Sequence, residues 1–294
     1  MNNFMATLLG ICAILLWATL AALTVLTFGI PVFEWLALTL GLAGLLALVL
    51  AILIKTKSSS AKPRFPLGAF AFTTAGIFGY HYLYFTALNL IAPAYSSLIL
   101  YLWPLLIVVF NALLYERALK WQHALGVLLG FVAMICLLLP SLTQQSNNQM
   151  SLIGLGVALA GAFVWSGYSV LNRSFAAQSH PLMLPAALLA CAGLALILSL
   201  SSEVWVWPNF KQSFGLLALA LGPMGFAFYC WDIGTKKGNL GLLGVISYST
   251  PILSTLLLVV LGMQEGNKLL YLASFLVTLA ALIASTAKRK AQAK

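Results

Sequence analysis

Long apolar runs separated by short polar gaps dominate the chain from beginning to end. Most runs are about 20 residues long, the length that an α-helix needs to cross the hydrocarbon core of a bilayer. The gaps carry Pro, Gly, Ser, Asn or charged residues, which interrupt helices. The pattern predicts ten transmembrane helices, at residues 5–27, 33–54, 68–90, 93–115, 121–140, 150–172, 182–201, 213–234, 241–262 and 269–287.

The composition supports a membrane protein. Of 294 residues, 62% are hydrophobic and only 7% are charged, whereas a soluble domain carries about 25% charged residues. So few charges cannot cover a water-exposed surface, so lipid must be the main solvent. The first run, from Met5 to Thr27, is longer than the apolar core of a signal peptide. We therefore expect it to be a span of the mature protein and not a cleaved leader.

The basic residues indicate the orientation. The net charge of +10 would suggest nucleic-acid binding in a soluble protein, but here the positive-inside rule explains it better. If the N-terminus is cytoplasmic, only Lys211 and Lys268 fall outside, and the other basic residues fall inside. The inner set is Lys55, Lys57, Lys62, Arg64, Arg117, Lys120, Arg173, Lys236, Lys237, Lys288, Arg289, Lys290 and Lys294. This predicts a multi-pass protein of the bacterial inner membrane with both termini in the cytoplasm.

The two halves of the chain resemble each other at an offset near 147 residues. The matched positions are Trp17 with Trp165, Gly76 with Gly222, Tyr101 with Tyr248 and Pro104 with Pro251. We expect a first five-helix repeat at residues 1–145 and a second at 146–294. Five spans are an odd number, so the second repeat must enter the membrane from the opposite side. Inverted repeats are typical of transporters that alternate access to a shared midplane site.

The repeat also resembles a known family. Pro104 is followed by Glu116, Gly126 and Gly130, and Pro251 is followed by Glu265. This pattern is similar to the EamA-type repeat of the drug/metabolite transporter superfamily. The segments 79–88 and 98–106 resemble the aromatic amino acid exporters within it. The resemblance implies a transporter without cofactor, not an enzyme, that exports amino acids, chiefly Phe, Tyr and Trp, by alternating access through a central aromatic cavity.

Three residues suggest where that cavity lies. His81 is the one ionisable side chain deep inside a predicted span, and such residues are functional candidates by default. It could line the site, carry protons, or simply hydrogen-bond within the bundle. Pro104 and Pro251 lie mid-span at equivalent positions and predict kinked helices. The kinks could be hinges at the site or could serve packing alone.

Aromatic residues cluster around the same positions. Trp17 and Trp165 lie too deep in their spans for the interfacial belts in which we expect Trp35, Trp121, Trp205 and Trp207. Ring pairs favour an aromatic or apolar solute, although deep rings could also be plain core. By resemblance to the exporters, we expect the substrate to be bound by Tyr80, His81, Tyr84, Tyr101, Trp103, Trp165, Ser247 and Tyr248, with Pro104 and Pro251 as hinges.

Other readings remain open. Another small metabolite or drug of the same superfamily is the main alternative, although no buried acid is available to pair with a cationic drug. A lipid-modifying enzyme would need a catalytic constellation or metal ligands, and no span offers one. A scaffold would leave the repeat unexplained.

Asp232 and Lys236 are expected to form a surface ion pair. The four cysteines have no metal or disulfide spacing and should pack in the core: Cys12, Cys136, Cys191 and Cys230. A monomer suffices for transport.

Overall fold

The computed structural model describes residues 2–53, 65–91, 93–144, 151–178, 180–263, 265–266 and 268–286, and every element in these ranges is helical. The first half contains α1 (Asn3–Ala18), α2 (Leu20–Thr24), η1 (Val25–Thr27), α3 (Val32–Leu53), α4 (Leu67–Leu90), α5 (Pro93–Leu100), α6 (Trp103–Asn111), η2 (Ala112–Glu116) and α7 (Trp121–Gln144). The second half contains α8 (Leu152–Leu171), η3 (Asn172–Phe175), α9 (Met183–Ser202), α10 (Phe210–Leu221), η4 (Gly222–Phe226), α11 (Ala227–Lys237), α12 (Leu240–Ile246), α13 (Ser249–Val260) and α14 (Lys268–Ser285).

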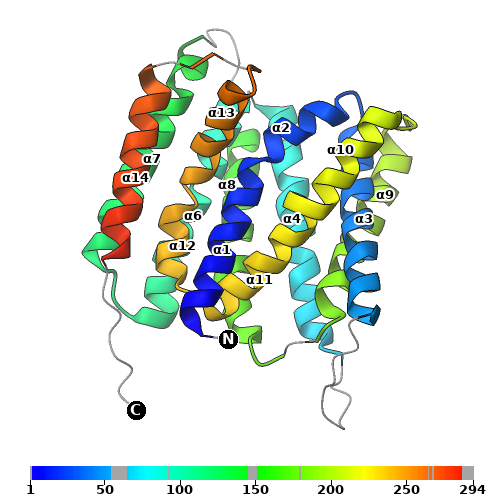
Figure 1. Ribbon diagram of the computed structural model, residues 1–294, viewed down its shortest axis with the longest axis horizontal. Coiled ribbons are helices and arrows are strands. Elements are labelled where there is room, and N and C mark those ends of the chain that lie inside the picture. Colours follow the sequence, from blue (N-terminus) through cyan, green and yellow to red (C-terminus); the bar gives the residue numbers. More distant parts are fainter. Residues whose placement is uncertain are drawn as a thin grey trace.

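These elements join into the ten predicted segments (Figure 1). Seven segments of the described chain are long and apolar enough to cross a membrane by themselves. The apolar stretches of α7 and α14 within the described residues are shorter, at Trp121–Cys136 and Lys268–Ala284. Helix α4 has the length of a span but carries His81 and several Tyr and Thr residues. These polar side chains lower the mean hydropathy of α4, and three of them, Tyr80, His81 and Tyr84, line a cavity.

Both predicted proline kinks are present. The fourth segment breaks at Tyr101 and Leu102, just before Pro104, and the ninth breaks at Ser247 and Tyr248, just before Pro251. Proline lacks the N–H that would continue the helix, and its ring clashes with the preceding turn. The eighth segment has a break that we did not predict, where Gly222 and Pro223 open the π-turn η4.

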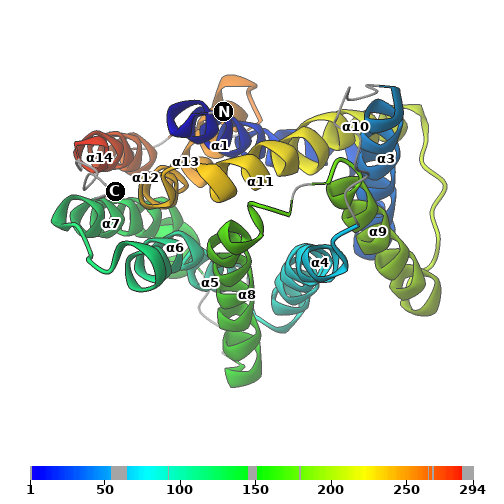
Figure 2. The same cartoon turned by 90° about the horizontal axis from the view of Figure 1, so that it is seen from below.

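The halves pack against each other reciprocally. Helix α1 packs on α11 as α8 packs on α4, while α3 meets α9, α7 meets α14 and α6 meets α12. Figure 2 shows α7 beside α14 at one end of the molecule and α3 beside α9 at the other. Small residues permit these close approaches. A Cβ on Gly234 of α11 would lie 2.7 Å from the Cα of Gly10 on α1.

Two faces of the bundle can be told apart. On one face, called the N-terminal face, Asn3 Nδ2 donates to the Lys237 carbonyl at 2.6 Å, and Arg173 Nη2 donates to the Gly238 carbonyl at 2.9 Å. On the opposite face, Gln212 Nε2 donates to the Phe28 carbonyl. The Glu203 carboxylate there accepts the backbone N–H groups of Phe33 and Glu34, each at 2.9 Å. These bonds cap the start of α3 from the end of α9.

Basic residues divide unequally between the faces. Arg117, Lys120, Arg173, Lys236 and Lys237 belong to segment ends on the N-terminal face. Helices α10 and α14, which carry Lys211 and Lys268 in their first turns, begin on the opposite face (Figure 1). The remaining basic residues of the predicted inner set lie outside the described residues: Lys55, Lys57, Lys62, Arg64, Lys288, Arg289, Lys290 and Lys294.

Candidate functional site

A cavity of two connected chambers lies in the middle of the bundle. The upper chamber has a volume of about 460 Å³ and reaches the opposite face, where Thr27, Phe28 and Gly29 line its mouth. The lower chamber adds about 130 Å³ toward the N-terminal face. Six residues line both chambers: Leu20, Tyr80, His81, Tyr101, Trp103 and Met224. The combined size suits one small organic solute.

Aromatic rings form the wall and floor of the lower chamber. Trp165 meets Trp17 edge-on, with ring centroids 5.6 Å apart, and contacts Tyr80 at 5.0 Å. Trp231 is fully buried and lies 5.1 Å from Trp17 and 6.0 Å from Trp103, so it closes the floor. The faces and edges of these rings provide stacking and edge-to-face partners for another ring.

Hydrogen bonds hold the floor in place. The Trp17 indole N–H donates to the Pro223 carbonyl at 3.0 Å, which ties α1 to η4. A Cβ at Gly225 would collide with the Ala220 carbonyl inside this π-turn, so glycine is required there. The Trp231 N–H donates to Ser169 Oγ at 3.0 Å, with both residues buried. The ring planes are therefore fixed before any solute arrives.

His81 presents a polar group to both chambers. Its Nδ1 lies 2.8 Å from the Ile77 carbonyl oxygen, one turn earlier on α4. A carbonyl oxygen only accepts, so Nδ1 carries the proton of this bond. The other ring nitrogen, Nε2, remains to meet a solute. The hydroxyl of Thr250 also lines the lower chamber and has no hydrogen-bond partner among the described residues.

Most of the predicted site residues come together here. The residues that line one or both chambers are Tyr80, His81, Tyr84, Tyr101, Trp103 and Trp165. Pro104 and Pro251 follow the helix breaks that place Tyr101 and Thr250 at the cavity. None of the described lining residues is Asp, Glu, Lys or Arg.

Ser247 and Tyr248 must be corrected, because neither lines the cavity. Ser247 is fully buried, and its hydroxyl donates to the Leu243 carbonyl at 2.7 Å. The Tyr248 ring is also fully buried and packs against Gly130 of α7, where a Cβ would come within 2.6 Å of it. The break before Pro251 therefore turns Thr250, and not these two residues, toward the chamber.

Two further expectations change. Trp35 is not an exposed belt residue, because it is buried, donates to Thr27 Oγ1 at 2.9 Å and lines the upper chamber. Trp121 and Trp207 are 66% and 84% exposed, as a belt requires. The ion pair between Asp232 and Lys236 forms as predicted but is buried and not at the surface.

Sequence reasoning missed several lining residues. Phe228 lines the lower chamber, and Trp231 packs beneath the lining rings of Trp17, Trp103 and Trp165. The internal repeat held a signal for both, since at an offset of 147 residues Phe228 is equivalent to His81 and Trp231 to Tyr84. Met224 has no such signal, because η4 alone brings it to the cavity.

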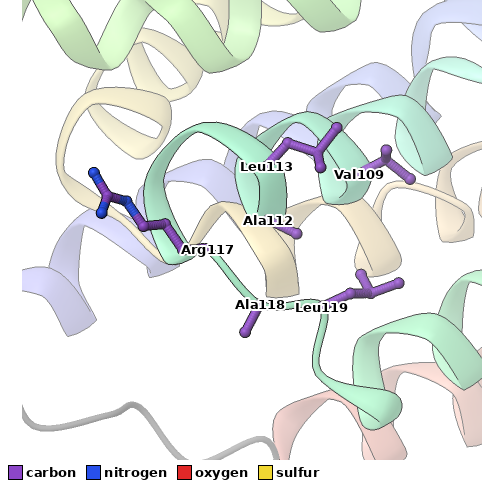
Figure 3. A pocket seen from close by; sticks show the side chains of 6 residues that line it. All are labelled: Val109, Ala112, Leu113, Arg117, Ala118 and Leu119. Carbon is purple, nitrogen blue, oxygen red and sulfur yellow. The ribbon is translucent and has the colours of Figure 1, made fainter.

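A second hollow, of about 410 Å³, lies where η2 leads into α7 (Figure 3). Apolar side chains form most of it, and Leu113 and Leu119 are 70% and 53% exposed. The Arg117 side chain points away from these leucines in Figure 3. This hollow faces outward from the bundle, so the central cavity is the better candidate for a transport site.

Comparison with known proteins agrees with this architecture. The model of the EamA-like transporter family matches twice, at residues 4–139 and 152–286. The aromatic amino acid exporter YddG of Ancylobacter novellus is 38% identical over 290 residues, covering 99% of this chain and 100% of the relative. The YddG of Escherichia coli is 27% identical, covering 89% and 90%. A solved crystal structure superposes with a TM-score of 0.86 at 38% identity, covering 96% and 98%. The chain is thus an all-helical membrane protein with two EamA repeats, and it belongs to the EamA-like transporter family.

Proposed function

We propose that this protein exports aromatic amino acids, namely Phe, Tyr and Trp, across the bacterial inner membrane through its central cavity. The main support is the cavity wall, in which Trp17, Tyr80, Trp103 and Trp165 surround a space whose described lining residues carry no Asp, Glu, Lys or Arg. The rings match an aromatic side chain. His81 Nε2 and the Thr250 hydroxyl supply polar partners for the amino acid backbone. Relatives named as aromatic amino acid exporters support the same substrate class.

We also propose an inverted arrangement of the repeats, 1–145 and 146–294, with both termini in the cytoplasm. Asn3 at the start of α1 and Arg173 at the end of α8 lie on the same face, which fits opposite directions for the two repeats. The excess of basic residues on that face fits a cytoplasmic location. The cavity that reaches the opposite face then opens to the outside, and rocking about the breaks before Pro104 and Pro251 would expose it to the inside. One chain provides the whole cavity, so a monomer suffices.

Flux assays in proteoliposomes test the proposed function. Purified protein and empty vesicles are compared for uptake of radiolabelled tryptophan and phenylalanine. Unlabelled tyrosine, alanine, threonine and a cationic dye serve as competitors. We expect saturable uptake that aromatic amino acids inhibit and alanine does not. The absence of uptake above empty vesicles, from protein shown to be folded, would reject the aromatic assignment.

The orientation has its own test. A cysteine-reactive, membrane-impermeant reagent is applied to intact cells that carry one added cysteine beside Lys211 or beside Lys120, in a background without the four natural cysteines. We expect labelling beside Lys211 in intact cells and labelling beside Lys120 only after lysis. The reverse pattern would invert the proposed direction of the chain.

The main alternative is another small solute carried by the same cavity. A cationic drug would need a counter-charge that the described lining residues lack. Strong inhibition by the dye, together with weak inhibition by tyrosine, would favour this alternative.

A further inference from the structure

A buried ion pair lies on the N-terminal face, below the floor of the cavity. Lys236 Nζ is 2.9 Å from the Asp232 carboxylate one turn earlier on α11. The two side chains are only 5% and 14% exposed. Taking two charges out of water carries a desolvation penalty that their mutual attraction often fails to offset. The pair lies in the last two turns of α11, and neither residue lines the cavity.

Side-chain hydrogen bonds that join α8 and η3 to α11 lie between the pair and the cavity. On α8 and η3, Trp165, Ser169 and Asn172 are spaced by four and three residues, so they follow one helical face. Trp231 of α11 donates to Ser169, and Asn172 Nδ2 donates both to Asp232 Oδ1 and to Thr235 Oγ1, each at 3.0 Å. The seam between these two helices is therefore closed by polar contacts that run from the aromatic floor to the ion pair.

The side-chain oxygen of Asn172 can accept a further hydrogen bond. Its Oδ1 is buried and has no hydrogen-bond partner among the described residues, and the residue is 1% exposed. Buried polar atoms without partners are uncommon and need an explanation. These oxygens form a group of polar atoms around one amide, since the Asp232 carboxylate and the Thr235 hydroxyl both accept from Asn172 Nδ2. A primary ammonium group, with three N–H donors, needs such a group.

The proposed substrate has charges that the cavity does not match. An amino acid carries an ammonium and a carboxylate, and neither finds a counter-charge among the described lining residues of the two chambers. An unpaired charge is unfavourable in a site shielded from water. Asp232 with Lys236 is a pair of opposite charges between the cavity floor and the N-terminal face.

Building on the proposed function, we propose that Asp232, Lys236 and Asn172 form a loading site for the amino acid backbone. When the seam opens from the N-terminal face, the ion pair separates around the substrate. The ammonium group binds the Asp232 carboxylate and Asn172 Oδ1, and the carboxylate binds Lys236 Nζ. The insertion leaves no charge unpaired, and the long lysine side chain allows it. The substrate ring then lies next to Trp231, so onward movement leads into the aromatic cavity.

This arrangement makes the two faces unequal. The ion pair of Asp232 with Lys236 lies on the N-terminal face, where the substrate is captured. The chambers on the opposite side lack this pair, so the backbone charges are better solvated by water once the cavity is open. The pair then favours capture on the N-terminal face, while the concentration gradient of the substrate sets the direction of net transport.

The test uses the double variant Asp232→Asn with Lys236→Gln, because Asp232→Asn alone would leave a buried lysine without a counter-ion. Phenylalanine transport is measured from each face, in inverted and right-side-out membrane vesicles. Phenethylamine, which lacks the carboxylate, and 3-phenylpropionate, which lacks the ammonium, serve as competitors. Thermal unfolding verifies that the variant is folded. The matched control is Glu116→Gln with Lys120→Gln, another pair one turn apart on the same face, at 3.1 Å.

From the N-terminal face, wild type should prefer phenylalanine to either analogue by about tenfold or more, since hydrogen bonds to charged groups are strong. The double variant should raise the KM from this face by about tenfold and lose the preference, with no change from the opposite face. The control variant should keep the wild-type KM and the preference for phenylalanine over the two analogues. An unchanged KM and preference would make the pair merely structural. Altered rates from both faces with an unchanged preference for phenylalanine would mean that the pair only holds the seam closed and does not bind the substrate. Either result overturns the loading site, whereas wild type that carries no phenylalanine refutes the proposed function itself.

Discussion

The indole rings of Trp165 and Trp231 lie nearly parallel, with planes 14° apart and centroids 6.3 Å apart. Trp165 also meets Trp17 and Trp103 edge-on, at 5.6 and 6.3 Å. Trp165 and Trp231 each contact the other three tryptophans of this cluster, and Trp165 is the one of the two that lines the lower chamber. The shape of the proposed binding surface therefore depends on Trp165 more than on any single neighbour.

Trp165→Ala should weaken transport of tryptophan without preventing membrane insertion. The substitution removes one ring from the proposed binding surface, and a ring contact is worth about 0.5–1.5 kcal/mol, so the KM should rise by up to about tenfold. Trp165→Phe keeps part of the surface and should lie between wild type and the alanine variant. Proteoliposome flux measures the effect, and gel filtration in detergent shows whether the protein is folded. Normal transport by folded Trp165→Ala would remove this residue from the site.

His81→Phe tests the polar contact at the cavity. Phe228 occupies the equivalent position of the second repeat and lies 6.1 Å from His81, so a phenyl ring is a reasonable replacement in shape. The variant loses Nε2 and with it one hydrogen bond to a charged backbone group. We expect the KM for phenylalanine to rise by about tenfold. His180→Phe, the same change outside the cavity, is the control and should behave like wild type. Equal KM values for the two variants would exclude the contact.

The sequence predicts the ten helices well because a span in lipid must be apolar and must satisfy its own backbone hydrogen bonds. It also locates much of the cavity, since Tyr80, His81 and Tyr84 are too polar for a lipid-facing stretch of α4. It fails for Tyr248. The repeat pairs this residue with Tyr101, yet only Tyr101 lines the cavity. When a cavity opens to one face, equivalent residues of two repeats lie in different surroundings, and the sequence alone does not say which one is exposed.

The sequence likewise does not predict that the Asp232–Lys236 pair is buried. Spacing of four residues predicts that the two side chains meet. Whether they meet in water depends on Asn172, which is distant in the sequence and reaches Asp232 only through the packing of η3 on α11.

Gly130→Ala should destabilise the protein. The added Cβ would lie 2.6 Å from Cδ2 of Tyr248, so the tyrosine ring must shift within a filled core. Overpacking of this kind costs about 1–3 kcal/mol, and the thermal unfolding temperature in detergent should fall. Gly156→Ala is the matched control, because nothing lies within 4 Å of the added atom. It should be neutral or stabilising, since alanine favours helices over glycine by up to about 1 kcal/mol. Equal unfolding temperatures for the two variants would contradict the packing of Tyr248 on Gly130.

Pro104→Ala and Pro251→Ala test whether the two helix breaks move during transport. Alanine restores a backbone N–H and removes the ring that clashes with the preceding turn, so each segment can straighten through its break. If opening and closing limit the rate, the maximal rate should fall by about tenfold while the KM stays within about twofold, because the aromatic wall is unchanged.

Pro185→Ala is the matched control for both hinge variants. Pro185 is buried, as Pro104 is, but it lies in the first turn of α9, where a whole segment begins and not where two helices of one segment meet. Its substitution should leave rate and KM unchanged. A rate loss equal to that of Pro104→Ala would mean that proline removal acts through general stability. A raised KM with a normal rate would assign Pro104 and Pro251 to shaping the cavity and not to its movement.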